Sequence, residues 1–230
     1  MASSTQWKLR RLAGRVIRII QRRKASSPVI GAYEGTTVPK ARAFTQAYDR
    51  TATYAGTYRK EMNEGRNAVG VLLTAMRAWI PLVARDVNGL IASEFGDQPN
   101  VPDDVIDDAE RLITIIDLHR NAADEPLPYR EAALAQLTPA LESAAKEWQE
   151  AESADKTYQD LLQTVRAAAD AFDVDLIALR RSLIAVGGRN DKDYQKLRAI
   201  RAAAADEDDD ADGPPSSTVV PAEPGDPPPR

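Results

Sequence analysis

Residues 129–186 decide the fold, and they read YREAALAQLTPALESAAKEWQEAESADKTYQDLLQTVRAAADAFDVDLIALRRSLIAV. Side chains suited to a helix seam recur there at alternating steps of three and four residues, and Asp155 is the only polar member. A 3.5-residue period kept over so many turns predicts a long helix that faces a partner helix along its whole length. The seam positions are Leu134, Leu137, Leu141, Ala144, Trp148, Ala151, Asp155, Tyr158, Leu162, Val165, Ala169, Phe172, Leu176, Leu179, Leu183 and Val186.

A similar seam runs through residues 39–95, which we expect to form the partner helix. Thr51 and Gly65 are its weak points. Pro81 should kink or divide the helix, because proline removes a backbone hydrogen bond and crowds the preceding turn. The seam positions are Phe44, Tyr48, Thr51, Ala55, Tyr58, Met62, Gly65, Val69, Leu72, Met76, Trp79 and Val83.

Two long helices separated by residues 96–128 predict an all-α fold, an elongated antiparallel helical hairpin with short flanking helices. If Pro81 and Pro139 break the helices, the same pattern gives a coiled-coil-like bundle of about four or five shorter helices. We favour the hairpin. The short elements expected around it are a loop over 96–102, a helix over 103–121, a turn over 122–128, a helix stop at Gly187-Gly188 and a last helix over 190–205.

The N-terminal segment, residues 1–24, contains a predicted amphipathic helix over 5–24. Plotted at about 100° per residue, its basic and apolar side chains separate onto opposite faces. The basic face carries Lys8, Arg11, Arg15, Arg18 and Arg22. The apolar face carries Leu9, Leu12, Ala13, Val16, Ile17, Ile19 and Ile20. Trp7 precedes them, and its amphipathic ring suits a membrane interface.

This N-terminal helix has three functional interpretations. It lies on an anionic membrane with its apolar face in the acyl boundary, it docks that face on a protein partner, or it contacts nucleic-acid phosphates. Nucleic acid is the weakest, because the rest of the chain is acidic. A structural alternative is packing against the protein's own helices, and an Arg-rich segment without acids also fits an organellar transit peptide.

The formal net charge of −5 conceals a strong asymmetry between the two ends of the chain. Residues 25–38 contain serine, proline and glycine and are predicted to be a linker, followed by a helical body over 39–205. Residues 206–230 begin with the acidic run Asp-Glu-Asp-Asp-Asp-Ala-Asp and continue with clustered prolines. This composition predicts a disordered tail, because it offers little apolar surface to bury.

No pattern in the sequence predicts a catalytic or metal site. The chain has no cysteine, which excludes a disulfide framework and a thiolate metal site. Residues 103–107, Asp-Asp-Val-Ile-Asp, resemble the aspartate-rich motif of helical isoprenoid synthases, which would imply magnesium. We favour the simpler interpretation that acids at a helix start complement the helix dipole. His119 is interpreted as a surface or boundary residue, and Gly187-Gly188 as a helix stop.

We therefore expect a non-enzymatic coiled-coil scaffold or assembly protein without a cofactor, acting through a protein partner or self-association. The alternative is a peripheral membrane protein anchored by the N-terminal helix. Asp155 is expected to set the register of the helix pair, opposite Arg66 or Asn67. The order of parts, an amphipathic helix before a long helical hairpin, resembles that of the phage shock protein A family. No apolar run approaches the ~20 residues of a membrane span, so we expect a cytoplasmic protein, peripheral at the membrane if the alternative holds.

Overall fold

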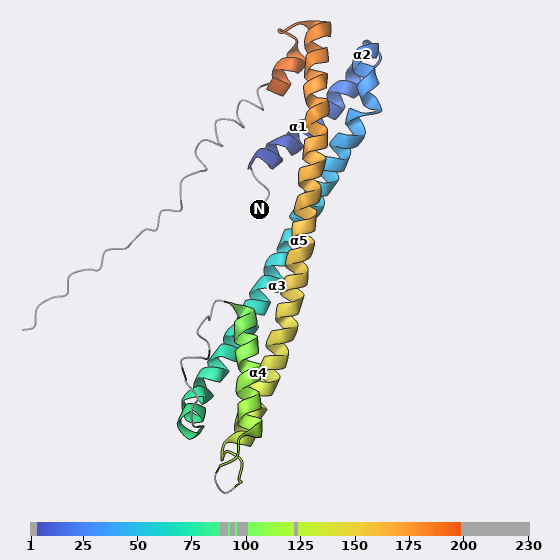
Figure 1. Cartoon of the computed structure of the whole chain (residues 1–230). Coiled ribbons are helices and arrows are strands. Elements are labelled where there is room, and N and C mark those ends of the chain that lie inside the picture. Colours follow the sequence, from blue (N-terminus) through green and yellow to red (C-terminus); the bar gives the residue numbers. More distant parts are fainter. Residues whose placement is uncertain (1–3, 88–91, 93–94, 96–100, 122–123, 199–230) are drawn as a thin grey trace, which may run out of the picture. The chain divides into compact units, whose positions relative to one another are not determined.

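The computed structural model describes residues 4–87, 92, 95, 101–121 and 124–198, and these are mostly helical (Figure 1). The elements are α1 (Ser4–Arg23), α2 (Pro28–Gly31), the 3-10 helix η1 (Ala32–Glu34), α3 (Thr37–Asp86), α4 (Pro102–Leu118) and α5 (Arg130–Gly187). In this described part of the chain the only β-type pairing is an isolated bridge between Arg120 and Pro126. The expected all-α class and the two long helices are confirmed.

The chain divides into two compact units, and α3 and α5 each contribute to both. Unit 1 is formed by Thr45–Ala168, which holds the C-terminal part of α3, all of α4 and the N-terminal part of α5. Unit 2 is formed by Ala2–Phe44 and Ala169–Arg230, which hold α1, α2, η1, the start of α3 and the end of α5.

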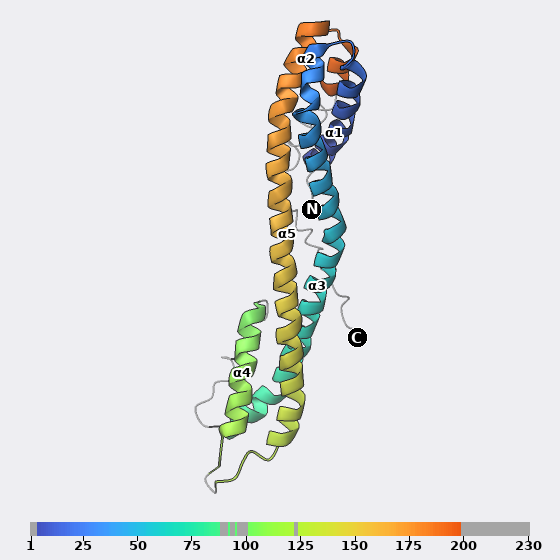
Figure 2. The ribbon, with the colours of Figure 1, turned by 90° about the vertical axis from the view of Figure 1, so that its right-hand side faces the viewer.

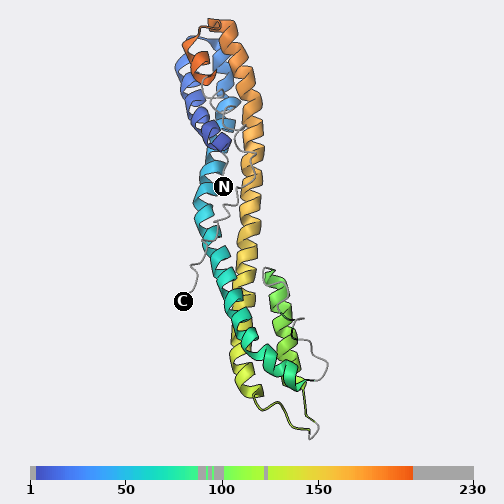
Figure 3. The ribbon, with the colours of Figure 1, turned by 90° about the vertical axis from the view of Figure 1, so that its left-hand side faces the viewer.

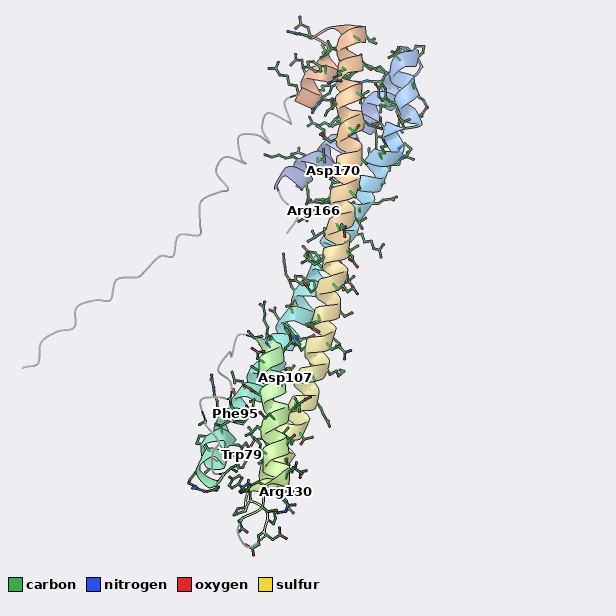
Figure 4. All side chains as sticks on the ribbon, viewed as in Figure 1. Trp79, Phe95, Asp107, Arg130, Arg166 and Asp170 are labelled. Carbon is green, nitrogen blue, oxygen red and sulfur yellow. The ribbon has the colours of Figure 1, made fainter. Side chains whose placement is uncertain are left out.

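In unit 1, α3 and α5 run antiparallel. The rings of Tyr58 and Tyr158 are stacked with centroids 4.5 Å apart. Further along α3, Trp79 Nε1 donates a hydrogen bond to Gln136 Oε1 at 2.9 Å, so residue numbers rise on one helix as they fall on the other. The Trp79 side chain lies at the end of unit 1 where α5 begins at Arg130 (Figure 4).

Gly65 marks a close approach of the two helices in unit 1. A Cβ atom placed on Gly65 would lie 3.0 Å from the Cβ of Ala151 and 3.1 Å from the backbone oxygen of Glu147. Gly65 therefore does not weaken the seam, as its small size suggested, but allows the backbone of α3 to pass close to α5.

Helix α4 completes the core of unit 1, where it lies beside α3 and α5 (Figure 3). Its buried side chains recur at steps of three and four residues, as expected for an amphipathic helix with one face in a core. They are Val105, Ala109, Leu112 and Ile116. They join one apolar cluster with residues of the other two helices, including Val69, Leu72, Met76, Val83, Leu137 and Ala144.

In unit 2, the same two helices are also antiparallel. The rings of Phe44 and Phe172 are stacked with centroids 6.2 Å apart, and both side chains are fully buried. The Lys40 ammonium lies 2.7 Å from Asp175 Oδ1, one turn away from that aromatic pair. The pairing direction deduced from the sequence is therefore present in each unit.

The predicted seams match the observed burial closely. Every seam position of α3 is buried or half-buried, and on α5 only Val186, the last one, is exposed. Neither Pro81 nor Pro139 divides its helix. The end of α3 changes direction within unit 1 (Figure 2), and α3 ends at Asp86, short of the predicted residue 95.

The linker predicted for residues 25–38 is wrong in part, because it contains α2, η1 and the first residues of α3. The Ser27 hydroxyl accepts a hydrogen bond from the backbone N–H of Ile30 at 3.4 Å, and Pro28 occupies the first helical turn. Serine as N-cap followed by proline is a helix-start signal. The fully buried Ile30 then fixes this short helix in unit 2.

The predicted helix stop after α5 is confirmed. Gly188 has φ +74, the left-handed conformation that glycine adopts without a steric penalty at a helix end. Residues 192–198 form the described part of the last short helix, so its predicted extent to 205 lies partly outside the described residues. The prediction of disorder for 206–230 also lies outside them.

One stretch, Pro28–Asp86, is long and apolar enough to cross a membrane by length and composition, which the sequence reading did not anticipate. Its apolar window has a mean hydropathy of 1.4, and 39% of that window is buried inside the protein. Core helices and membrane spans both meet this criterion, so it is weak evidence for either.

Candidate functional site: a basic groove on α1

The apolar face of α1 is buried within unit 2. The residues predicted to enter a membrane or to dock on a partner pack instead against the other elements of the unit, and Leu9 and Ile17 are half-buried. The most enclosed are Leu12, Ala13, Val16, Ile19 and Ile20, each at most 5% exposed. The structural alternative considered for this helix, packing on the protein's own body, is therefore what the structure contains.

The basic face of α1 stays at the surface. Arg11, Arg18 and Arg22 are exposed, and Lys8 and Arg15 are half-buried. At the N-terminal end of this face Trp7 is 48% exposed. The Arg11 guanidinium carbon lies 4.8 Å from the centre of the Trp7 ring, a cation–π contact.

The C-terminal end of α1 is joined to residues 191–193 by ion pairs. Arg23 Nη2 lies 2.8 Å from Asp191 Oδ2, and Arg23 Nε lies 2.7 Å from Asp193 Oδ2. Arg22 also pairs with Asp193. Both carboxylates are buried while Arg22 is exposed, so the pairs run from the interior of unit 2 to its surface.

Asp191 is also the N-cap of the helix over 192–198. Its Oδ1 accepts hydrogen bonds from the backbone N–H of Asp193 at 2.8 Å and of Tyr194 at 3.0 Å. Burial by itself would raise the pKa of Asp191. The N–H of Tyr194 and the guanidinium of Arg23 outweigh burial, so the pKa of Asp191 is lowered. In return, the two carboxylates overcome the effect of burial and raise the pKa of Arg23.

Beside these ion pairs lies a partly open cavity of about 340 Å³, here called the basic groove. It is lined by Arg15, Arg18, Ile19, Arg22, Asp193 and Lys196. The single acid, Asp193, is already paired with Arg22 and Arg23. Among the residues that the structure describes, Arg15, Arg18 and Lys196 have no ion-pair partner. Guanidinium and ammonium groups gathered in this way bind carboxylate or phosphate oxygens.

Sequence reasoning identified the α1 half of this groove and missed the other half. Arg15, Arg18, Ile19 and Arg22 were all assigned to this helix from its periodicity. Lys196 was not singled out. The available signal was Asp191 following Gly187-Gly188, since an aspartate after a helix stop is a common N-cap of a following helix.

Asp155, the predicted register residue, is half-buried on α5 and faces Tyr58 of α3. Burial, and then the charge and hydrogen bonding of Asp155, raise the pKa of Tyr58, while the charge of Arg66 acts in the opposite direction. The predicted partner Arg66 is therefore near the same hydroxyl group. The role of Asp155 in setting register stays a prediction.

Asp103 and His119, the other residues considered for catalysis or metal binding, both belong to the ends of α4. Asp103, in the first turn of α4, accepts a hydrogen bond from Trp148 Nε1 at 3.0 Å. His119 is the C-cap of α4. In the described ranges no group of three or more histidine and acidic side chains is arranged to hold a metal ion.

No protein-family model matches the chain, and neither a curated protein nor a solved structure is significantly similar to it.

Proposed function

We propose that this protein is a non-enzymatic helical scaffold, and that its basic groove binds an acidic segment of a protein partner. The observation that carries the proposal is the division of α1, whose apolar face is buried in unit 2 while its basic face lines the groove. The charges of Arg15, Arg18 and Lys196 are then available to the carboxylates of a partner, because no acidic side chain among the described residues neutralises them.

The long helices support the scaffold part of the proposal. Within unit 1, α3 and α5 pair along the stretch that contains the stacked rings of Tyr58 and Tyr158. Seam residues such as Met62 and Leu162 are only half-buried there, whereas Leu72 and Leu137, in the three-helix part of the unit, are fully buried. Half-buried apolar side chains along this helix pair offer surface to another helix, from a partner or from a second copy of this chain.

The groove is tested with a labelled hexaglutamate peptide whose binding to the full chain is followed by fluorescence anisotropy at low salt. The variant Arg15→Gln/Arg18→Gln/Lys196→Gln should weaken binding about tenfold where no other acidic segment competes for the groove. Three exposed pairs at about 0.5 kcal/mol each give roughly 1.5 kcal/mol, and 1.4 kcal/mol is tenfold in Kd.

A control variant carries the same change of charge on another surface. Arg42, Arg50 and Arg59 are exposed on α3 outside the groove, so replacing all three with Gln should leave the Kd within about twofold. Hexaglutamine should not bind either variant. Equal losses in the groove variant and the control would mean that net charge alone drives binding, and the proposed groove function would be abandoned.

Peripheral membrane binding remains the second candidate, favoured by the exposure of Trp7 beside the basic face. Val16 is fully buried, so replacing it with Asp would unfold unit 2 and would not report on membrane contact. The suitable variant is Trp7→Ala in the full chain, assayed by flotation with phosphatidylserine vesicles. Loss of flotation in this variant would support the membrane candidate, whereas no flotation of the unmodified protein would exclude it.

A further inference from the structure

The last described residues of the chain lie beside the basic groove. Asp193 pairs with Arg22, and Lys196, one turn later, lines the groove together with Arg15 and Arg18. Residues 192–198 therefore run antiparallel to α1 (Figure 3), and Lys196 lies beside the arginines of its basic face. The chain leaves residue 198 heading from Arg22 toward the N-terminal end of α1.

The acidic run lies within reach of that face whatever conformation joins it to residue 198. Residues 198 and 206 are separated by eight residue steps, which span about 12 Å if helical and at most about 28 Å if extended. The basic face from Arg18 back to Lys8 covers ten residue steps of helix, or about 15 Å. A helical connection thus reaches from Arg18 as far as Arg11, and an extended connection also reaches Lys8.

We infer that the acidic segment 206–212 of this chain occupies the basic groove and competes there with partner segments, an inference that rests on the groove function proposed above. Six acids in seven positions face a groove whose Arg15, Arg18 and Lys196 have no ion-pair partner among the described residues. No other run of comparable acid density occurs in the sequence. The charges of the segment and the groove are therefore complementary, and the chain itself holds them together.

Because few residues separate residue 198 from the acidic segment, the segment can fill the groove even if its affinity for the groove is weak. A tether of about eight residues gives the attached segment an effective concentration of about a millimolar. A segment that would bind the groove with a Kd of about 100 μM as a separate peptide would then fill it roughly nine-tenths of the time. An acidic partner would have to displace it, so the tail would set a threshold for partner binding.

A paramagnetic label on the tail tests the contact directly, because the chain has no native cysteine to compete for it. With the label on Ala211→Cys, inside the acidic segment, the amide NMR signals of Arg15 and Arg18 should broaden. The same label on Ala222→Cys, in the proline-rich part of the tail, is the control and should broaden them much less. Raising the salt concentration to about 0.5 M should restore the signals, because exposed charges are then screened.

The second measurement is the affinity for the hexaglutamate probe. Replacing the acids of residues 206–212 by Asn and Gln should tighten probe binding about tenfold, whereas Glu223→Gln/Asp226→Asn, in the same tail, should leave it unchanged. Unbroadened signals and an unchanged Kd would overturn the tail inference. If the groove variant still weakens the probe in that case, the proposed function stands. In a chain whose acids at 206–212 are replaced, a groove variant that binds the probe normally would instead remove the proposed function.

Discussion

Replacing Gly65 with Ala tests whether α3 and α5 approach as closely as the structure indicates. On an exposed helix surface, Ala in place of Gly stabilises by about 0.5–1 kcal/mol, because the unfolded chain loses conformational freedom. At Gly65 the added Cβ would lie 3.1 Å from the backbone oxygen of Glu147 and 3.2 Å from Cε3 of Trp148. A backbone atom cannot rotate away, so the helices must separate. Overpacking costs about 1–3 kcal/mol, which leaves a net loss of about 1–2 kcal/mol.

The same helix supplies two controls. Gly56 and Gly70 are exposed, and a Cβ on either would meet no atom within 4 Å. Urea unfolding followed by far-UV circular dichroism should show a gain of about 0.5–1 kcal/mol for each control alanine. The loss at Gly65 should lower the Tm by roughly 2–8 °C, at 2–4 °C per kcal/mol for a chain of this size. If Gly65→Ala stabilises as much as the controls do, the close approach of the helices is wrong.

Two further substitutions test the ion pairs and the seam. Asp191→Asn keeps an N-cap side chain and loses the charge facing Arg23, so we expect faster hydrogen exchange in α1 and a loss of about 1–3 kcal/mol. The pKa of Asp191 is lowered in the folded state, so the ionised carboxylate stabilises the fold fully above about pH 4, and this stabilisation fades as pH falls through the folded pKa. The Asn variant should lack that part of the acid dependence of stability. An identical pH profile of stability in the two proteins would refute the pairing. Asp155→Leu should gain about 1 kcal/mol in urea unfolding by adding apolar surface to a half-buried seam position. A loss of stability there would show that Asp155 holds Tyr58 in a contact that the fold needs.

The helix pair could be predicted because its information is periodic and local to each helix. Burial on α5 follows the heptad seam until Val186, which is exposed because the helix ends one residue later at Gly187. At Pro81 the sequence left open whether the helix is kinked or divided, and α3 continues through this residue. Pro81 is exposed, whereas its neighbours Ile80 and Val83 are buried in the core of unit 1.

The site was only half predictable, because its two halves come from opposite ends of the chain. Arg22 and Asp193 are 171 residues apart in sequence, and periodicity in α1 carries no information about which segment packs beside it. The strong amphipathicity of α1 was visible, but a membrane, a partner and the protein's own core all bind an apolar face through the same physical effect. Only the observed burial of Val16 and Ile20 shows that this face packs in the protein's own core and not on a membrane or a partner.

The burial of the apolar face of α1 also decides which kind of membrane contact is favourable. For α1 to insert its apolar side in a bilayer, Leu12, Val16, Ile19 and Ile20 must first leave the core of unit 2. At about 1.5–3 kcal/mol per buried side chain this costs roughly 6–12 kcal/mol, which insertion into the acyl boundary would only return. The Arg23 pairs would be lost in addition. The basic face, in contrast, meets an anionic surface without any rearrangement. Apart from the contribution of the exposed Trp7 ring, binding through α1 should therefore be electrostatic and weaken strongly at high salt, whereas an inserted helix would retain a larger part that salt does not screen.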